Sequence, residues 1–332
     1  MMKKIGMFIL VVLLVSTFSL SAQGAKEESD TLRLGISLMT YEHEFMQDML
    51  AAVKKYAAEN NIELFDVDGR NDVSVQLSGI EDMLNSKNID GLLLNPVDTD
   101  AIAPAVLDAN DAGVPVVTMD VGSSKGDVYA HVASNNIEIG KLAGNYAVDL
   151  LKERNGNVEG KIVIFGFSKI TSMRDRVAGF KEVLADYPAV ELIEREPIKL
   201  SVDDTLKLAE DTFTTYSNGE IDIYYGSNAT TLAGLVAAQG NSGRTDFQLV
   251  GVDDDPAFIK ALQSADSTLE AFVAQTPTDI GETAVNLIID AINGKEADKK
   301  VVATTITLVT RDSVKDYMKV VEERAELLKA YR

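Results

Sequence analysis

Polar side chains follow five apolar segments of the chain, each at the point where the segment ends. They are Asn95 after "GLLL", Asp120 after "PVVTM", Asn228 after "IDIYYGS", Asp253 after "LVGV" and Gln275 after "AFVA". If these segments are buried strands, leaving such a polar group unsatisfied costs roughly 1–3 kcal/mol. A loop cap or a turn can account for any one of them. Five at one edge of a sheet favour a polar ligand.

The residue types in this set suit a ligand that carries several hydroxyl groups. A hydroxyl both donates and accepts, so one carboxylate or amide can bond two neighbouring hydroxyls. Charge-assisted bonds are the stronger ones, which favours Asp120, Asp253 and Arg174 as the principal contacts. Tyr41 and Phe45 lie in the loop after the first apolar segment and Phe167 lies in a later loop, where an aromatic ring can pack on the C–H face of a sugar. These residues predict a site for a sugar-like small molecule.

The familiar signatures of catalysis are missing from the sequence. His43 and His131 are the only histidines, and they lie in different segments. There is no glycine-rich loop for a dinucleotide or a nucleoside triphosphate, and no Gly-x-Ser-x-Gly nucleophile motif. The run Asp253–Asp254–Asp255 could in principle bind a metal, but such a run more often begins a helix. We therefore expect a protein that is not an enzyme, with no cofactor and no bound metal.

These site residues need a sheet to position them, and the pattern of the chain predicts one. Short β-branched and aliphatic runs alternate with longer segments of helical periodicity. The predicted strands are Leu32–Ser37, Glu63–Asp68, Gly91–Leu94, Val116–Met119, Val128–Val132, Lys161–Phe165, Val190–Glu194, Ile221–Tyr225, Gln248–Val252, Leu269–Val273 and Val301–Val309. The predicted helices are Phe45–Asn60, Val73–Ser86, Ile137–Lys152, Met173–Asp186 and Ile280–Asn293, with an amphipathic helix in Asp316–Arg332. This alternation predicts an α/β fold with parallel sheets, whose strand-to-helix loops share the edge where such sheets bind ligands.

Composition excludes several classes of partner and predicts export. The 332 residues carry a formal net charge of −21, so nucleic acid and anionic membranes are not expected partners. Cysteine is absent, which excludes disulfides and thiolate chemistry. Lys3 and Lys4 precede an apolar run and then small residues, the layout of a secretory signal peptide over residues 1–25. An uncleaved anchor is the alternative, but the run is shorter than the about 20 residues of a membrane span. We expect the protein in the periplasm or on the extracytoplasmic face.

Six segments together resemble the ribose-type sugar-binding proteins of ABC transporters, which have the type I periplasmic binding fold. In the order and spacing of that family they are Leu92–Val106, Ala112–Asp120, Lys125–Gly144, Thr171–Phe180, Leu249–Pro256 and Val273–Gly281. The resemblance covers the chain from Thr31 to about Val309. It implies two Rossmann-like lobes joined by a multi-strand hinge, with the ligand in the cleft between them and capture by hinge closure.

The resemblance also implies a role for each polar site residue. Asp120 matches the carboxylate that binds ring hydroxyls from the N-terminal lobe. Arg174, in its Thr-Ser-x-Arg context, matches the arginine of the second lobe. Asn228, Asp253 and Gln275 match the amide, carboxylate and amide that complete that lobe's side of the cleft.

The sequence departs from the family at two positions of the site. Val121 stands where the ribose binders carry an arginine, which removes up to five donors from the pocket. Phe45 and Met46 stand where they carry two adjacent aromatics. These differences leave room for another pentose, a hexose, a deoxysugar or a polyol, and a nucleoside or a signalling furanone stays open as the alternative. The calcium-loop pattern of some relatives is not evident in Asp211–Asp222, so no calcium is expected.

The resemblance implies a division of the chain and a set of partners. We expect an N-terminal lobe of residues 31–133 with 276–306 and a C-terminal lobe of residues 134–275 with 307–332. The hinges are expected near Ala133–Asn135, Thr276–Pro277 and Ile306. The implied partners are the sugar-like ligand, the permease of an ABC transporter and, for chemotaxis, a chemoreceptor, with the protein itself a monomer.

Overall fold

The fold is built on two six-stranded sheets. The computed structural model describes residues 31–332, so the predicted signal peptide over residues 1–25 lies outside the described residues. The first sheet has the order β11-β5-β4-β3-β1-β2 and is parallel throughout. Its strands are β1 Arg33–Leu38, β2 Glu63–Asp68, β3 Gly91–Leu94, β4 Val116–Met119, β5 Ala130–Ser134 and β11 Val301–Thr304.

The second sheet repeats this order with different strands. It runs β12-β10-β9-β8-β6-β7, and only the edge strand β12 is antiparallel to its neighbour. Its strands are β6 Gly160–Phe165, β7 Val190–Arg195, β8 Ile223–Gly226, β9 Gln248–Val252, β10 Leu269–Gln275 and β12 Ile306–Thr310. The predicted α/β architecture with parallel sheets is therefore confirmed, and β4 and β9 occupy equivalent places in the two sheets.

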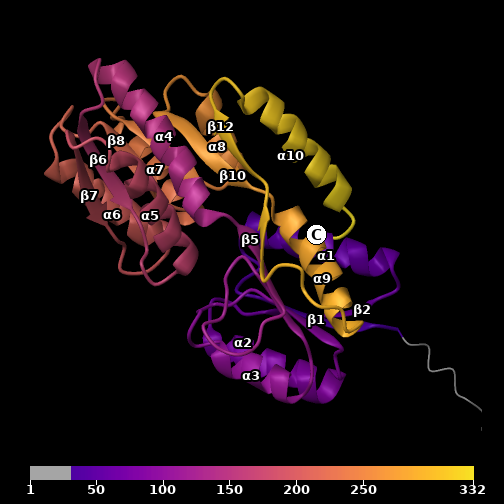
Figure 1. Ribbon diagram of the computed structural model, residues 1–332. Helices are drawn as coiled ribbons and strands as arrows, with labels where there is room; N and C mark the ends of the chain where they lie inside the picture. The colour runs from indigo at the N-terminus through magenta and orange to yellow at the C-terminus, as the bar shows by residue number, and fades with distance from the viewer. Residues whose placement is uncertain (1–30) are drawn as a thin grey trace, which may run out of the picture. The chain divides into compact units, whose positions relative to one another are not determined.

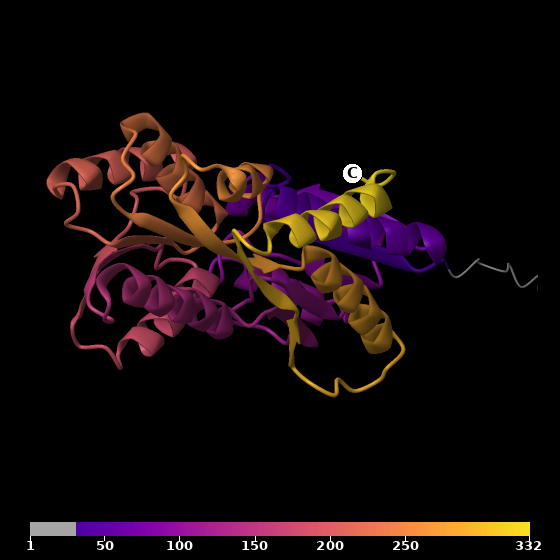
Figure 2. The same ribbon diagram turned by 90° about the horizontal axis from the view of Figure 1, so that it is seen from above.

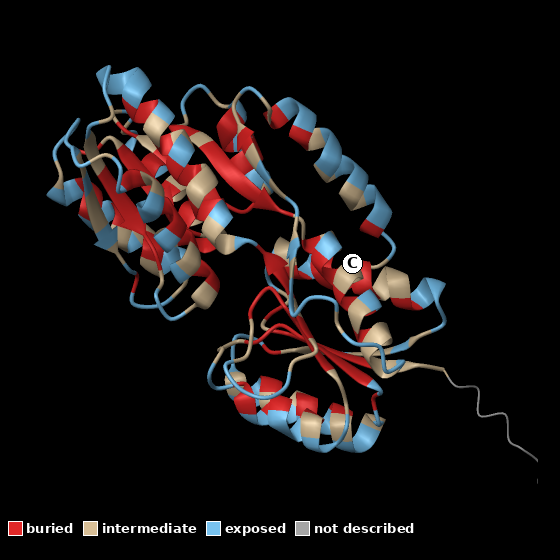
Figure 3. Cartoon of the chain, in the orientation of Figure 1, coloured by how far each residue is buried: buried red, intermediate tan, exposed pale blue. Residues whose placement is uncertain are grey.

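Helices cover both faces of each sheet and bury four apolar clusters (Figure 1, Figure 3). On the first sheet, α1 and α9 pack on one face and α2 and α3 on the other. On the second, α4 and α5 pack on one face and α6, α7 and α8 on the other. Their bounds are α1 Glu44–Glu59, α2 Val73–Asp82, a π-helical turn η1 Met83–Lys87, α3 Ala103–Asp111, α4 Asn136–Asn155, α5 Thr171–Leu184, α6 Val202–Thr215, α7 Ala229–Ser242, α8 Pro256–Gln263, α9 Pro277–Ile292 and α10 Val314–Leu328.

Burial on two faces explains the uninterrupted apolar strands. All four residues of β3 and of β4 are buried, as are those of β8. Strands covered on both faces by helices read as continuous apolar runs rather than alternating ones. Among residues 31–332, no helix is both long and apolar enough to cross a membrane.

The chain passes between the two sheets three times. It leaves the first sheet after β5, at Ser134, and returns after β10, where Gln275 is followed by α9. The third passage is at Thr305, between β11 in the first sheet and β12 in the second. The single strand predicted over Val301–Val309 is thus wrong, because its two halves pair with different sheets, β11 with β5 and β12 with β10.

Candidate functional site

The two aspartates at the ends of β4 and β9 share an unusual backbone. Asp120 has φ 60° and Asp253 has φ 75°, both in the left-handed region that few non-glycine residues adopt. The amide of Asp120 donates to Val132 O at 2.8 Å, and that of Asp253 donates to Val273 O at 2.9 Å, so each turn is fixed by the neighbouring strand. Both residues line one cleft.

On the side of the first sheet, Asn95 supports Asp120 and is not itself at the cleft surface. Asn95 is fully buried, and its Nδ2 donates to Met119 O at 3.0 Å and to Asp120 Oδ2 at 3.5 Å. Burial raises the pKa of Asp120 to about 6, while Arg176 opposes that shift and Asp253 adds to it. The strand-end pattern therefore predicted that Asn95 and Asp120 lie together, but Asn95 supports Asp120 by a hydrogen bond and does not line the cleft.

On the side of the second sheet, Asp253 is held by three neighbours. Its Oδ2 accepts from the Ala229 amide at 2.8 Å and lies 3.7 Å from Arg176 Nη1. Its Oδ1 accepts from Gln275 Nε2 at 2.5 Å. The amide oxygen of Gln275, Oε1, is buried and has no hydrogen-bond partner within the described part of the chain. A ligand hydroxyl would satisfy that oxygen.

Asn228 has a structural role as well as a place in the cleft. It is the N-cap of α7, and its Oδ1 accepts from the Thr231 amide at 2.9 Å in a capping box. Asn228 also lines the cleft. Because its oxygen is already engaged, its amide nitrogen is the group left to donate to a ligand.

The structure places Arg176, rather than Arg174, at the cleft. Arg176 is 3% exposed, and its Nε donates to Asn136 Oδ1 at 2.8 Å and its Nη1 to Ser227 O at 3.2 Å. Arg174 is exposed, donates to Ser168 O and Thr171 Oγ1 at 3.0 Å each, and lines a separate hollow of about 370 Å³. Two positions on a helix differ by about 200° in direction, so the two arginines point to different sides of α5.

Of the three predicted aromatics, the structure brings Phe45 and Phe167 to the cleft but not Tyr41. Phe45 is the second residue of α1 and lines the cleft beside Met46. Tyr41 is half-buried, and its hydroxyl donates to Asp66 Oδ2 at 3.3 Å at the side of the first sheet. Phe167, in the loop after β6, supplies a ring from the opposite wall.

The cleft is large enough for a small molecule and is lined by both apolar and polar side chains. Its volume is about 420 Å³, within the usual range of small-molecule sites. Val121 is 5% exposed and lines it, so no donor is present at that position. No group of three or more histidine, cysteine, aspartate or glutamate residues within 31–332 is arranged to hold a metal ion. The arrangement can bind a polyhydroxylated compound, with carboxylates and amides for hydroxyls and aromatic faces for C–H groups.

Comparisons with known proteins point to one family. Residues 34–296 match the family model described as a periplasmic binding protein domain. The ribose import binding protein RbsB of Salmonella typhimurium is 28% identical over 299 residues, which cover 90% of this chain and 96% of that protein.

Two solved structures share the fold. A solute-binding protein of an ABC transporter from Bacillus halodurans C-125, with bound myo-inositol, aligns with a TM-score of 0.77 at 26% identity, covering 88% of this chain and 99% of the other. The binding-protein component of the arabinose transporter from Shewanella sp. ANA-3 aligns with a TM-score of 0.79 at 22% identity, covering 90% of this chain and 99% of the other.

Proposed function

The chain belongs to the periplasmic binding protein family, and on that premise we propose that it captures a monosaccharide or a related polyol and delivers it to an ABC transporter. Members of this family are substrate-binding proteins of transporters, not enzymes. The similar proteins support a sugar, since one is named for ribose import and another was solved with myo-inositol. Both compounds carry several neighbouring hydroxyls and no charge.

The observation that carries the proposal is the set of groups that converge on the cleft. Asp120 approaches from the first sheet, and Asp253 and Arg176 approach from the second. The unpaired Oε1 of Gln275 requires a donor, because a buried acceptor without a partner costs roughly 1–3 kcal/mol. A sugar hydroxyl can donate to that oxygen and accept from Arg176 or Asn228 at the same time.

Capture would proceed by hinge closure between two lobes. We propose that the lobes comprise residues 31–133 with 276–306 and residues 134–275 with 307–332. The three passages between the sheets, at Ser134, after Gln275 and at Thr305, then serve as the hinges. No covalent bond is made or broken, and the closed form presents the sugar to the permease.

Export is the remaining element of the proposal. Periplasmic capture requires secretion, and the signal peptide predicted over residues 1–25 would provide it. Mass spectrometry of the exported protein should find an N-terminus between Ala22 and Lys26. An intact Met1 in the cytosolic fraction would contradict this assignment.

The test is a binding screen of residues 32–332 by thermal shift and calorimetry. The panel contains pentoses, hexoses, deoxysugars, polyols and nucleosides, because Val121 removes the arginine expected in a ribose binder. A compound at 100 times its Kd should add about 2.7 kcal/mol to the free energy of unfolding. One sugar or polyol that binds with one-to-one stoichiometry supports the proposal. A shift with a nucleoside alone, or with nothing in the panel, refutes it.

A further inference from the structure

The C-terminal helix α10 packs against elements of both sheets. At its beginning, Val314 and Tyr317 belong to the apolar cluster of the second sheet, where the Tyr317 ring lies 5.9 Å from that of Phe272. At its end, Leu328 packs with Ala51 and Ala52 of α1, which covers the first sheet. Both ribbon views show α10, in yellow, extending from the second sheet to α1 (Figure 1, Figure 2). The family match ends at residue 296, before this helix begins.

A buried arginine in α10 forms ion pairs in both directions. Arg324 Nε lies 2.9 Å from Asp48 Oδ2 of α1, and Arg324 Nη2 lies 2.7 Å from Asp254 Oδ2, in the loop after β9. The three side chains are 10%, 1% and 7% exposed. Tyr317 donates its hydroxyl to Asp254 Oδ2 at 2.7 Å, and Arg332 also binds Asp48.

These charges are compatible with burial only as a set. Burial raises the pKa of Asp48, and the two arginines oppose that shift. Removing one member leaves the others charged in a place with little water, which is far more costly than breaking an exposed pair. The cluster therefore links α1, α10 and the loop after β9 and favours the arrangement in which all three stay in contact.

Both acids of this cluster adjoin residues of the binding cleft. Asp254 directly follows Asp253, the carboxylate held by Arg176 and Gln275. Asp48 lies in the first turns of α1, close to Phe45, which lines the opposite wall. Arg324 itself lies outside the cleft. It binds α1 and the loop after β9, and these two segments carry Phe45 and Asp253 on opposite walls of the cleft.

We propose that Arg324 is a positioning residue for ligand capture: through Asp48 and Asp254 it sets the separation of the walls that carry Phe45 and Asp253. Helix α10 then acts as a tether between the lobes, in addition to the three hinge passages. The tether favours the arrangement in which both walls face one cleft, so capture starts from a population that is already competent. Only the nature of the captured compound rests on the function proposed above.

The experiment measures the distance between the lobes without any sugar. The chain has no cysteine, so Asp108→Cys on α3 and Lys207→Cys on α6, both exposed, give one specific pair of spin labels. We expect a narrow distance distribution in the otherwise unchanged protein and a broader, longer one in Arg324→Gln. Arg324→Lys, which keeps the charge, should fall between them. Asp254→Asn provides a second disruption of nearly unchanged volume, should Arg324→Gln fail to fold.

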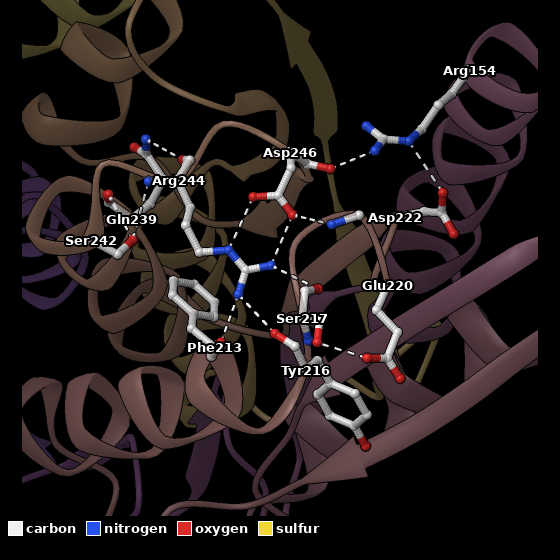
Figure 4. Close-up of polar contacts among 11 residues, drawn as sticks. Arg154, Phe213, Tyr216, Ser217, Glu220, Asp222, Gln239, Ser242, Arg244 and Asp246 are labelled. Carbon is white, nitrogen blue, oxygen red and sulfur yellow. Dashed lines mark hydrogen bonds and ion pairs between the residues drawn. The ribbon is translucent and has the colours of Figure 1, made fainter.

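The matched control is Arg244, an arginine whose side chain is equally exposed, at 10%, and whose bonds all lie within the second lobe (Figure 4). Arg244 pairs with Asp246 at 2.8 Å and donates to the carbonyls of Phe213 and Tyr216 at 2.6 and 3.0 Å. Arg244→Gln should lower the melting temperature and leave the distance between the lobes unchanged. An equal change in both variants would show general destabilisation and overturn the proposal.

Affinity gives the second readout. Calorimetry uses D-ribose, L-arabinose and myo-inositol as probes, and for any that binds, Arg324→Gln should weaken binding at least tenfold while Arg244→Gln changes it less than twofold. Unchanged distances in Arg324→Gln and Asp254→Asn, or tighter binding in either, would overturn the tether. If no probe binds, the sugar assignment is weakened, and the spin-label distances still decide the role of Arg324.

Discussion

Replacing Arg176 by methionine should separate the true cleft arginine from its neighbour in the sequence. The side chain of Arg176 is 4% exposed, lies 3.7 Å from Asp253 Oδ2 and donates hydrogen bonds to Asn136 and Ser227. Removing one partner of a buried charge pair costs about 3–5 kcal/mol. For Arg176→Met we expect the free energy of unfolding to fall by about 3 kcal/mol, near the lower end of this range, because water in the cleft can reach Asp253.

The effect on binding should be larger than the loss of a single contact. Arg176 opposes the rise in the pKa of Asp120 and pairs with Asp253, so methionine disturbs both carboxylates that face the ligand. We expect the Kd for the sugar found in the screen to rise about a hundredfold, roughly 2.8 kcal/mol. Arg176→Lys should recover only part of this, because an ammonium lacks the planar fork of the guanidinium.

Arg174→Met is the matched comparison, on the same helix and two positions away. Its bonds go to Ser168 and Thr171 at an exposed surface, so the free energy of unfolding should change by less than about 0.5 kcal/mol. Urea denaturation and calorimetry on the two variants give both quantities. If Arg174→Met abolished binding and Arg176→Met did not, the assignment from the structure would be refuted and that from the sequence motif would stand.

Three further outcomes follow from individual contacts. Burial raises the pKa of Asp120 to about 6, and the ionised carboxylate is the form that accepts hydrogen bonds from sugar hydroxyls. Affinity measured by calorimetry should therefore be about tenfold weaker near pH 5 than at its plateau above pH 7. An affinity that does not change with pH would contradict this. The hydrogen bond from Arg244 lowers the pKa of Asp246 from 3.8 to about 2, so the ionised carboxylate stabilises the fold above pH 4. That contribution, about 1–2 kcal/mol in the free energy of unfolding, is lost as the pH falls towards 2. Asp246→Asn should flatten this part of the pH profile measured by urea denaturation, and an unchanged profile would argue against the pair. A Cβ on Gly140 would lie 2.0 Å from the carbonyl oxygen of Arg176, so Gly140→Ala should destabilise the protein by at least about 1–3 kcal/mol. Gly240 on α7 has open space around it, so Gly240→Ala should stabilise the protein by up to about 1 kcal/mol. Equal effects of the two variants in urea denaturation would show that the contact between α4 and α5 is not tight.

The sequence predicted the sheets well because burial on both faces leaves a direct trace in composition. The apolar runs at Gly91–Leu94 and Val116–Met119 coincide with β3 and β4. Over residues 301–310 the same reasoning failed, because "VVATTITLVT" contains no glycine or proline to mark a break. The break at Thr305 is set by the partners β5 and β10, which local sequence does not encode.

Most of the site was predicted from strand ends, and the predicted arginine on a helix, Arg174, lies outside the cleft. Asp120 and Asp253 follow strands and Gln275 is the last residue of one, so the common edge of parallel strands brings them together without further information. An arginine on a helix depends on rotation about the helix axis. Helical spacing could have identified Arg176, since Met173, Arg176 and Phe180 form the buried face of α5 and Arg174 does not belong to it.

The ion pairs of Arg324 with Asp48 and Asp254 could not be predicted from the sequence. Asp48, Asp254 and Arg324 belong to three distant segments, and each is an ordinary charged residue in its own context. The amphipathic pattern of Asp316–Arg332 predicted a helix with one apolar side. The sequence of that segment does not indicate that the apolar side packs on α1. Contacts of this kind appear only when the two sheets are placed together.

The repeated geometry of the two aspartates bears on the charge of the ligand. Each occupies a left-handed position at an equivalent strand end, a conformation that costs on the order of 1 kcal/mol and is held by the neighbouring strand. Two buried carboxylates then face one buried guanidinium, that of Arg176, which leaves an excess of acceptors deep in the cleft. Lys169 and Lys199 also line the cleft, but both are exposed, where water and salt screen their charge. Deep in the site a ligand with a carboxylate or phosphate would meet like charge, whereas neutral hydroxyls would donate to both aspartates. The geometry therefore favours an uncharged sugar or polyol over a sugar acid.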